Sequence, residues 1–191
     1  PVILPSLIVA CLPSIVAGLI IVSTTAKAAD LFVFGARFSI HDDLTSSARR
    51  RVSFKANDDG ISVAGIDPTA AGASIELVNP NAGVGQSASF NLPAGNWTVS
   101  GPRASGYRYR DRYLVQGPIR VAEIRDGRLI KFSGRGAGVT FALGGQPQTS
   151  IGINVASSGT RYCALFGGTV TRDDGRFFRA NSRDGGAGGR Y

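Results

Sequence analysis

Cysteine and histidine are nearly absent from this chain, and their scarcity excludes several classes of site. The 191 residues contain two cysteines and one histidine. Cys11 lies in an N-terminal apolar run that we expect to be removed, so Cys163 would be the one cysteine of the mature chain and could form no internal disulfide. Multi-cysteine metal sites are excluded for the same reason, and one histidine argues against most zinc and copper sites. The composition therefore predicts no metal and no cofactor, with Cys163 a small buried apolar residue.

Recognisable catalytic motifs are also missing. The histidine, His41, lies beside serine and aspartate in the stretch Ser39–Asp43, but a Ser-His-Asp triad needs a nucleophile that the fold brings to it. The chain has no G-x-S-x-G elbow. Its glycine-rich segment 134–138 has no Walker lysine and opens no predicted helix. We predict no catalytic residue, and we interpret His41 as a polar residue at a strand end.

Three aspartate pairs could supply hard oxygen ligands to calcium, but none matches an EF-hand loop. They are Asp42-Asp43, Asp58-Asp59 and Asp173-Asp174. Short acceptor side chains beside glycine favour tight turns, so we predict that all three pairs form turns. A pair of carboxylates for glycoside hydrolysis stays open at this point, because the distance between two carboxylates is a property of the fold. A hydrolase with an unrecognised site is therefore kept as a further alternative.

Helical periodicity does not persist over three turns anywhere beyond the N-terminal run. Short runs of alternating apolar residues, separated by glycine, proline, asparagine and aspartate, take its place. The runs cover residues 31–40, 51–56, 73–78, 88–92, 96–100, 107–113, 118–123, 128–133, 138–143, 150–156 and 160–180. The pattern predicts an all-β fold over residues 29–181, an antiparallel β-sandwich of about ten to twelve short strands.

The densest β signal is the stretch Thr160–Ala180. Tyr162, Ala164 and Phe166 would share one face of a strand, and the residues between them are also apolar, which predicts a central strand packed on both faces. The glycines at 167 and 168 allow a turn or bulge. Residues 173–175 then predict a second turn, and the strand that follows it should bury either Phe177 or Phe178. A separate hairpin is predicted around Asp126-Gly127.

The N-terminal residues indicate export. Residues 1–22 are apolar and uncharged, and Ala26 with Ala28 forms an A-x-A cleavage pattern. We expect a signal peptide over residues 1–28 and a secreted, periplasmic or cell-surface protein. An uncleaved membrane anchor and a lipoprotein box ending at Cys11 remain alternatives. The glycine-rich residues 182–191 are predicted to be a flexible tail.

Basic residues outnumber acidic ones by 21 to 13, which gives a net charge of +8 and a pI of about 10.2. Eighteen of the basic residues are arginine, a skew that we ascribe first to genomic base composition. The charge permits contact with polyanions. Because the leader indicates export, we expect a glycan or an anionic surface polymer as partner rather than nucleic acid. Contact with a membrane is expected only through the N-terminal segment, if it is not cleaved.

One stretch, residues 107–113, alternates tyrosine with arginine. An exposed strand with aromatic rings on one face and guanidinium groups on the other could bind sugars or anionic glycans. We take the following as candidate ligand-binding residues: Trp97, Tyr107, Arg108, Tyr109, Arg110, Arg112 and Tyr113. The alternative is an ordinary strand with its tyrosines inside the protein and its arginines in solvent.

Five segments, in this order, resemble a module of exported bacterial proteins whose function is not settled. They are RRRVSFKANDD at 49–59, DPTAAGASIELVNP at 67–80, FNLPAGNWTVSG at 90–101, IRDGRLIKFSGRG at 124–136 and TRYCALFGGTVTRDDGRFFRAN at 160–181. The resemblance implies an all-β extracytoplasmic domain, often appended to larger secreted proteins, and it supplies no catalytic residues. Such modules often have cysteines near the positions of Ile119 and Ser133, which this chain lacks.

These observations rank three functions. The first is a non-enzymatic extracytoplasmic β-sandwich for surface binding, adhesion or structural attachment. The second is a carbohydrate-binding or hydrolase-accessory module that uses the aromatic and arginine residues of 97–113. A hydrolase is the third.

Overall fold

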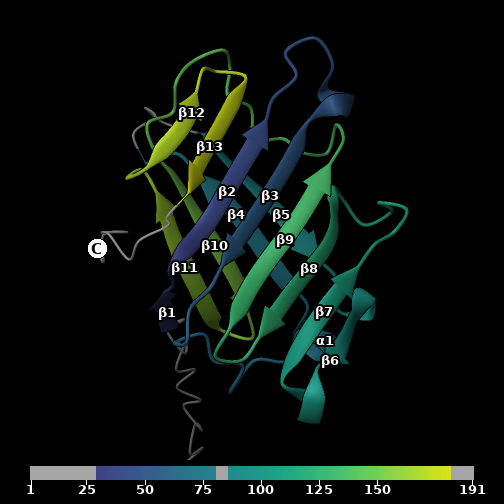
Figure 1. Cartoon of the computed structure of the whole chain (residues 1–191). Coiled ribbons are helices and arrows are strands. Elements are labelled where there is room, and N and C mark those ends of the chain that lie inside the picture. Colours follow the sequence, from purple (N-terminus) through teal and green to yellow (C-terminus); the bar gives the residue numbers. More distant parts are fainter. Residues whose placement is uncertain (1–28, 81–85, 182–191) are drawn as a thin grey trace, which may run out of the picture.

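The computed structural model describes residues 29–80 and 86–181, and over these ranges the chain is almost entirely β-structure (Figure 1). The all-β prediction is confirmed. The strands are β1 (Ala29–Phe32), β2 (Gly35–His41), β3 (Arg51–Ala56), β4 (Ala73–Val78), β5 (Ser87–Leu92), β6 (Trp97–Ser100), β7 (Gly106–Arg110), β8 (Ile119–Arg125), β9 (Leu129–Arg135), β10 (Ile151–Ser157), β11 (Thr160–Phe166), β12 (Val170–Asp173) and β13 (Phe177–Asn181). The predicted leader and tail lie outside the described residues.

Helical structure is limited to single turns in these ranges. The α-helix α1 spans Pro68–Ala71, and Asp67 begins it by accepting a hydrogen bond from the amide of Thr69 at 2.9 Å. The 3₁₀ turns are η1 (Ser47–Arg49), η2 (Ala94–Asn96) and η3 (Pro102–Ala104). None of the helices in the described ranges has the length and apolar character needed to cross a bilayer.

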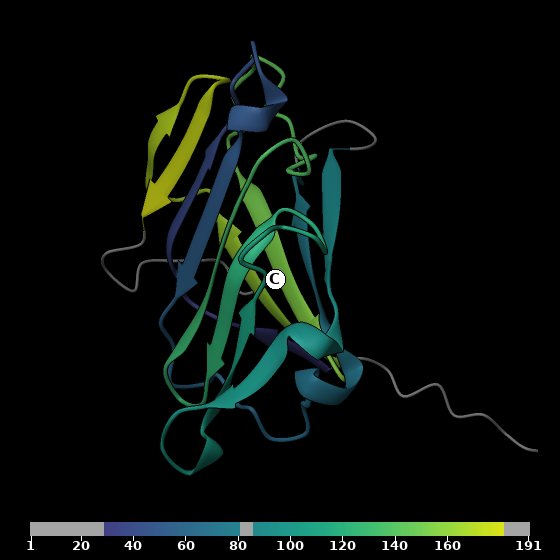
Figure 2. The ribbon, with the colours of Figure 1, turned by 90° about the vertical axis from the view of Figure 1, so that its right-hand side faces the viewer.

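The strands form two sheets that face each other (Figure 2). One sheet has five strands in the order β1-β11-β10-β4-β5, and the other has eight in the order β12-β13-β2-β3-β9-β8-β7-β6. Among the described strands, only β1 and β11 pair in parallel, and the other pairs are antiparallel. The predicted hairpin at Asp126-Gly127 is confirmed, because it joins β8 to β9.

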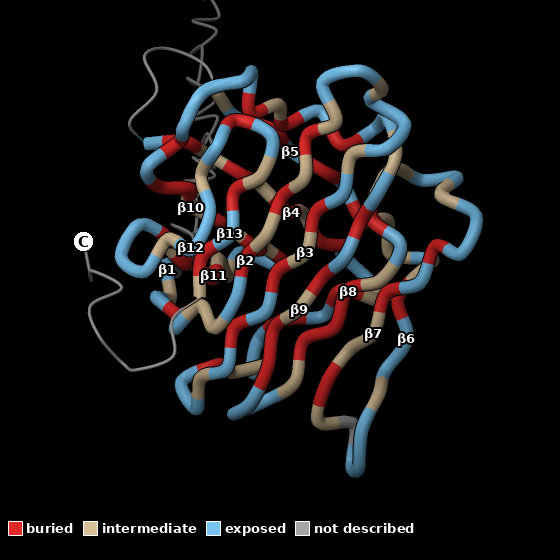
Figure 3. Tube along the Cα trace, turned by 45° about the horizontal axis from the view of Figure 1, so that its top comes forward, coloured by how far each residue is buried: buried red, intermediate tan, exposed pale blue. Residues whose placement is uncertain are grey.

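The alternating apolar residues of both sheets point into the space between them and form one core. Figure 3 shows this alternation as buried and exposed positions following each other along the strands. Phe166 of the five-stranded sheet lies 5.6 Å from Phe38 and 6.0 Å from Phe54 of the other sheet, measured between ring centroids. Aromatic contacts of this kind add to the stabilisation from burial. A methyl group on Gly35 would lie 2.6 Å from Phe166 Cε2, so only glycine admits this ring. The β2–β3 register shifts between Gly35 and Arg37.

Two predicted strands are in fact divided between the sheets. Residues 31–40 form β1 in the five-stranded sheet and β2 in the eight-stranded sheet, and the amide of Phe34 between them donates to the carboxylate of Asp58 at 2.7 Å. After Phe166 the chain likewise leaves the five-stranded sheet, and β12 and β13 form their hairpin in the other. Tyr162 and Phe166 are buried, as is Phe178, whereas the opposite face of β11 is only half-buried. The prediction that β11 is packed on both faces is therefore wrong.

The predicted strand at residues 138–143 does not form. Its residues Val139, Phe141 and Leu143 are buried in alternation, as expected, but its backbone is bound by side chains rather than by a neighbouring strand. The carboxylate of Asp42 accepts from the amide of Leu143 at 2.8 Å, and Arg50 Nη1 donates to the carbonyl of Val139 at 3.3 Å. These bonds satisfy polar groups that would otherwise be paired in a sheet.

Candidate functional site

The predicted aromatic platform is divided by the structure, and its two central rings lie in the core. Trp97 and Tyr109 are 5% and 1% exposed, respectively, and their ring centroids are 5.5 Å apart across β6 and β7. Trp97 Nε1 donates to the carbonyl of Leu92 at 3.2 Å. Burial, with the charge of Asp111 beside it, raises the pKa of Tyr109 to about 12. Neither ring is available to a ligand, because both pack inward from the sheet.

The other two tyrosines of the stretch occupy different positions. Tyr107 is half-buried, and its hydroxyl donates to the carbonyl of Ile66 at 3.0 Å. Tyr113 lies beyond the end of β7, in the β7–β8 loop, and is 81% exposed. The carboxylate of Asp111 braces this loop by accepting from the amides of Val115 at 3.1 Å and Gln116 at 2.7 Å. Only Tyr113 among the predicted aromatics therefore presents its ring to solvent.

Alanine substitutions at Tyr109 and Tyr113 should separate the two environments. We expect Tyr109→Ala to lower the free energy of unfolding by about 3–5 kcal/mol, because a buried aromatic side chain is removed from a packed core. Tyr113→Ala should change it by less than about 0.5 kcal/mol, as is usual for an exposed side chain. Urea denaturation followed by circular dichroism measures both values. Similar losses for the two variants would contradict the assigned environments.

Two arginines of the same stretch, Arg108 and Arg110, point the other way and join a larger set of cations, whereas Arg112 lies in the β7–β8 loop with its guanidinium 6.0 Å from the ring centroid of Tyr113. Arg108 and Arg110 lie on the outer surface of the eight-stranded sheet, opposite Glu123 and Val121 of β8. We call this surface the basic face. Its strands contribute Arg37, Arg51, Lys55, Arg108, Arg110, Arg125, Lys131, Arg135, Arg172 and Arg179.

Like charges lie directly opposite one another on the basic face. Arg37 pairs with Lys55, and Lys55 pairs with Lys131, so that three neighbouring strands each contribute one cation to a single row. We call these three residues the cation row. Arg51 lies opposite Arg135 in the same way, and Arg172 opposite Arg179. Opposed like charges destabilise a sheet, so this arrangement costs free energy in the absence of counter-ions.

Glu123 is the one carboxylate that the described strands place on this face. Its side chain is 2% exposed, and it binds Lys131 Nζ at 2.7 Å as well as Arg125. Burial raises the pKa of Glu123, but the hydrogen bonds and positive charges of Lys131 and Arg125 outweigh burial and leave the pKa below its ordinary value. Glu123 is therefore ionised at neutral pH and offsets part of the charge of Lys131. Arg37 and Lys55 have no ion pair within the described part of the chain.

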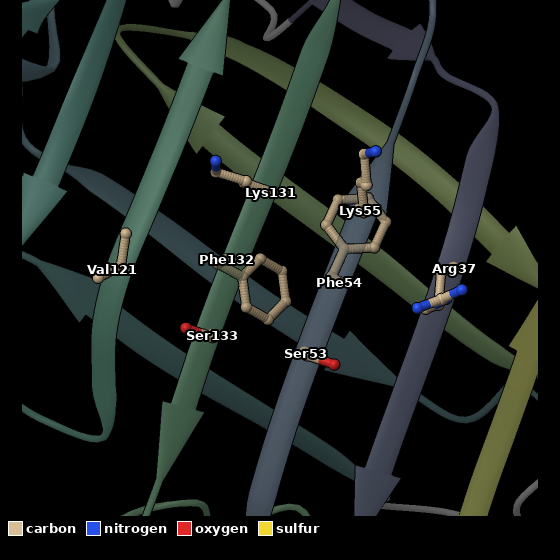
Figure 4. A pocket seen from close by; sticks show the side chains of 8 residues that line it. All are labelled: Arg37, Ser53, Phe54, Lys55, Val121, Lys131, Phe132 and Ser133. Carbon is tan, nitrogen blue, oxygen red and sulfur yellow. The ribbon is translucent and has the colours of Figure 1, made fainter.

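A hollow of about 170 Å³ lies on the basic face over the cation row. It is lined by Arg37, Ser53, Phe54, Lys55, Val121, Lys131, Phe132 and Ser133. Figure 4 shows Arg37, Lys55 and Lys131 on three neighbouring strands, with the hydroxyl groups of Ser53 and Ser133 beside them. Ser53 is itself paired with Ser39, whose Oγ lies 2.8 Å from its own. We call Ser39, Ser53 and Ser133 the serine row.

His41, the one histidine, belongs to a stack at the edge of the basic face. Its ring lies parallel to that of Phe177, with centroids 4.2 Å apart. The guanidinium of Arg172 lies over the Phe177 ring, 3.8 Å from its centroid. Arg172 also binds Asp174 at 2.7 Å and, with backbone amides, lowers the pKa of that carboxyl to about 2. His41 is the last residue of β2, which confirms the prediction of a strand-end residue.

One aspartate of each pair serves a local turn, as predicted, but Asp42 and Asp173 do not. Asp42 accepts from the amide of Leu143 and Asp173 from the amides of Gln148 and Thr149, so these two hold distant segments instead. Asp43 accepts from the amide and hydroxyl of Thr45, Asp58 accepts from the amide of Gly60, and Asp174 accepts from the amides of the turn that it begins. In residues 29–80 and 86–181, no three histidine, cysteine or acidic side chains come together in a way that could hold a metal ion.

The outer surface of the five-stranded sheet differs in charge. Arg161 binds Asp30 through two hydrogen bonds of 2.8 and 2.6 Å, and Glu76 accepts from Asn154 at 2.9 Å. Cys163 on this surface is half-buried rather than buried as predicted, and burial raises the pKa of its thiol. Of the two outer sheet surfaces, the basic face therefore carries the larger number of cations without an ion pair in the described ranges.

No protein-family model, curated protein or solved structure matches this chain.

Proposed function

We propose that residues 29–181 form an extracytoplasmic β-sandwich module without catalytic activity, which binds an anionic polymer of the cell exterior through its basic face. The observation that carries this proposal is the cation row, in which Arg37 and Lys55 lie side by side without a carboxylate partner in the described residues. The apolar run 1–22, followed by the A-x-A pattern of Ala26 and Ala28, supports export. Attachment of a cell or protein to a surface polymer would follow from this binding.

Electrostatics favour a polymer over a small anion. The like charges of the cation row repel one another, and a ligand with several negative charges relieves several repulsions at once. The cations stand on paired strands of one sheet, so their backbones are held in place before the ligand arrives. A surface with one sign of charge also attracts oppositely charged chains from a distance. We expect binding that weakens as salt is added, because salt screens exposed charges.

The chemistry of the face supports binding rather than turnover. Arginine and lysine hold anions but are charged at neutral pH and supply no general base. Glu123 is ionised and already bound by two cations, so it is poorly placed to act as an acid or a nucleophile. The hollow over the cation row is partly open to solvent, whereas catalytic sites generally exclude water.

A double variant tests the proposal against a matched control. We expect Arg37→Gln with Lys55→Gln to weaken binding of heparin, used as a general polyanion probe, at least about tenfold, because each charge-assisted hydrogen bond contributes ~1.5–3 kcal/mol. Arg103→Gln with Arg128→Gln removes the same charge from exposed positions in η3 and in the β8–β9 turn, outside the basic face, and should keep near wild-type affinity. Isothermal titration calorimetry at two salt concentrations measures both. Equal loss in the two double variants would reduce the effect to net charge and contradict the proposal.

A carbohydrate-binding role of the predicted kind is supported by Tyr113 alone. Its ring is exposed on a loop that Asp111 braces, and that loop follows Arg110 of the basic face. An aromatic ring held in this way can stack on a sugar at little entropic cost. On a glycan array, the Tyr113→Ala protein should then lose the neutral glycans that the wild type retains.

A further inference from the structure

We infer that the β7–β8 loop, residues 111–118, docks on an anionic lipid bilayer by placing Tyr113 and Val115 in the interfacial region of the membrane. This inference does not rest on the proposed polyanion site, whose cation row lies on β2, β3 and β9. It gives the folded domain a membrane contact of its own, in addition to the contact that the sequence predicts for an uncleaved N-terminal segment.

Two apolar side chains of this loop point into solvent. Tyr113 is 81% exposed and Val115 is 76% exposed, and these are the largest exposed fractions among the large apolar side chains of residues 29–80 and 86–181. Figure 1 shows the loop projecting beyond the ends of β7 and β8. Apolar surface in contact with water is unfavourable, and entry into an apolar phase removes that cost. The position of the pair at the tip of a projecting loop makes such entry possible.

Hydrogen bonds to Asp111 fix the shape of the loop. Its carboxylate accepts from the amides of Val115 at 3.1 Å and Gln116 at 2.7 Å, and its carbonyl accepts from the amide of Leu114 at 3.3 Å. Leu114 has a φ of 57°, a left-handed conformation that leucine rarely adopts. Because these bonds hold the loop before it meets a membrane, insertion of Tyr113 and Val115 orders few further groups and costs little conformational entropy.

Arginines surround the apolar pair. Arg110 precedes the loop, Arg112 lies in it and Arg120 follows it. All three are exposed, and none has an ion pair in the described part of the chain. The one acidic residue in positions 110–120 is Asp111, which is 4% exposed and bound to the loop amides. Positive charge beside exposed apolar side chains matches anionic headgroups above a hydrocarbon interior.

The residue types suit the interfacial region of a bilayer. A tyrosine ring is apolar, while its hydroxyl can stay at the level of the headgroups. An arginine can lay its apolar stem along such a ring and keep its charge among the phosphates. Arg112 already lies beside the ring, with its guanidinium 6.0 Å from the ring centroid of Tyr113. A sugar could stack on Tyr113 but would gain little from Val115, so Val115 distinguishes the two ligands.

Partitioning into large unilamellar vesicles tests the inference. The vesicles contain equal parts of phosphatidylglycerol and phosphatidylcholine, and the protein is the chain from residue 29 onward, which holds every described strand and lacks the apolar N-terminal run. We expect Tyr113→Ser with Val115→Ser to lower the partition coefficient at least about tenfold, because two apolar side chains are no longer buried in the bilayer. Val99→Ser removes an apolar side chain that is 54% exposed on β6 and should leave partitioning unchanged.

The arginines and the depth of insertion are measured separately. Arg112→Gln with Arg120→Gln should lower partitioning into these vesicles about fivefold for each charge, and should have little effect on vesicles of phosphatidylcholine alone. Arg103→Gln with Arg128→Gln is the matched control and should lose less. In Val115→Trp, tryptophan emission should move to shorter wavelength with anionic vesicles and be quenched by lipids with brominated acyl chains. Val99→Trp should show neither effect.

Equal partitioning of the wild type and the serine double variant would overturn the inference, because the loop would then stay outside the bilayer. Absence of binding to anionic vesicles would also overturn it, while the heparin titration would still decide the polyanion site. If Arg37→Gln with Lys55→Gln abolishes the quenching of Val115→Trp, the basic face makes the membrane contact and the inference is wrong. Glycan binding that depends on Tyr113, without vesicle binding, would assign the loop to sugars instead. Circular dichroism of each variant confirms that it is folded.

Discussion

Replacement of Asp42 by alanine is expected to lower the free energy of unfolding by about 3–5 kcal/mol. The substitution breaks a buried ion pair and leaves the charge of its partner, Arg50, uncompensated. The carboxylate is 0% exposed and accepts from Arg50 Nε at 2.7 Å and from the amide of Leu143 at 2.8 Å. Loss of Asp42 would leave a mostly buried guanidinium without a counter-charge and a buried amide without a partner. It would also release the segment around Leu143 that covers one end of the core.

The neighbouring aspartate provides the control. Asp43 binds the turn at Thr45 and Ser46, and these bonds lower the pKa of its carboxyl. Because Asp43 serves a turn at the surface, Asp43→Ala should destabilise the protein less than Asp42→Ala. Urea denaturation at neutral pH measures both. In a double-mutant cycle, Arg50→Met combined with Asp42→Ala should recover part of the loss, because no unpaired buried charge remains. Equal losses for the two aspartate variants would contradict the role of Asp42.

Most strands could be predicted from the sequence, because the alternation of apolar and polar residues is visible within each short segment. In Arg51–Ala56, alternation alone places Val52 and Phe54 inside, and the structure agrees. The segment 138–143 carries the same alternation but forms no strand. Its partners, Asp42 and Arg50, lie about a hundred residues earlier in the chain, and nothing in the alternation reveals them.

The candidate site was less predictable from the sequence, because the pairing register of the strands decides which residues lie next to one another on the basic face. Arg37, Lys55 and Lys131 come from three separate parts of the sequence, and only the pairing of β2, β3 and β9 brings them together. The tyrosine-arginine stretch was predicted as the binding site instead, because its aromatic and basic residues follow one another in the sequence. Its alternation is real, but the structure matches the ordinary-strand alternative at β7, where Tyr109 is buried and Arg110 is exposed. The sequence did offer one signal for the cations: the alternation of apolar residues places each of them at an outward-facing position of its predicted strand.

Gly175 has the least room for a side chain among the described glycines, and it contacts the same segment, near Leu143, that Asp42 binds. Gly175 lies in the turn between β12 and β13 with a φ of 75°, a conformation that favours glycine. Its carbonyl accepts from the amide of Gly145 at 3.2 Å, which joins this turn to the segment that closes the core. A Cβ atom on Gly175 would lie 2.5 Å from the amide nitrogen of Gln146 and closer still to the carbonyl of Gly145. Backbone must therefore move to admit even alanine.

Gly175→Ala should consequently cost about 3–4 kcal/mol, the sum of backbone strain of about 1–2 kcal/mol and displacement of packed neighbours. Gly159 separates the two contributions, because its φ is 82° and nothing lies within 4 Å of its Cβ position. Gly159→Ala should cost only the strain. In a domain of this size the two variants should lower the melting temperature by roughly 6–16 °C and 2–8 °C, respectively. Calorimetric melting curves that shift equally would show that the turn at Gly175 does not pack against Gly145 as described.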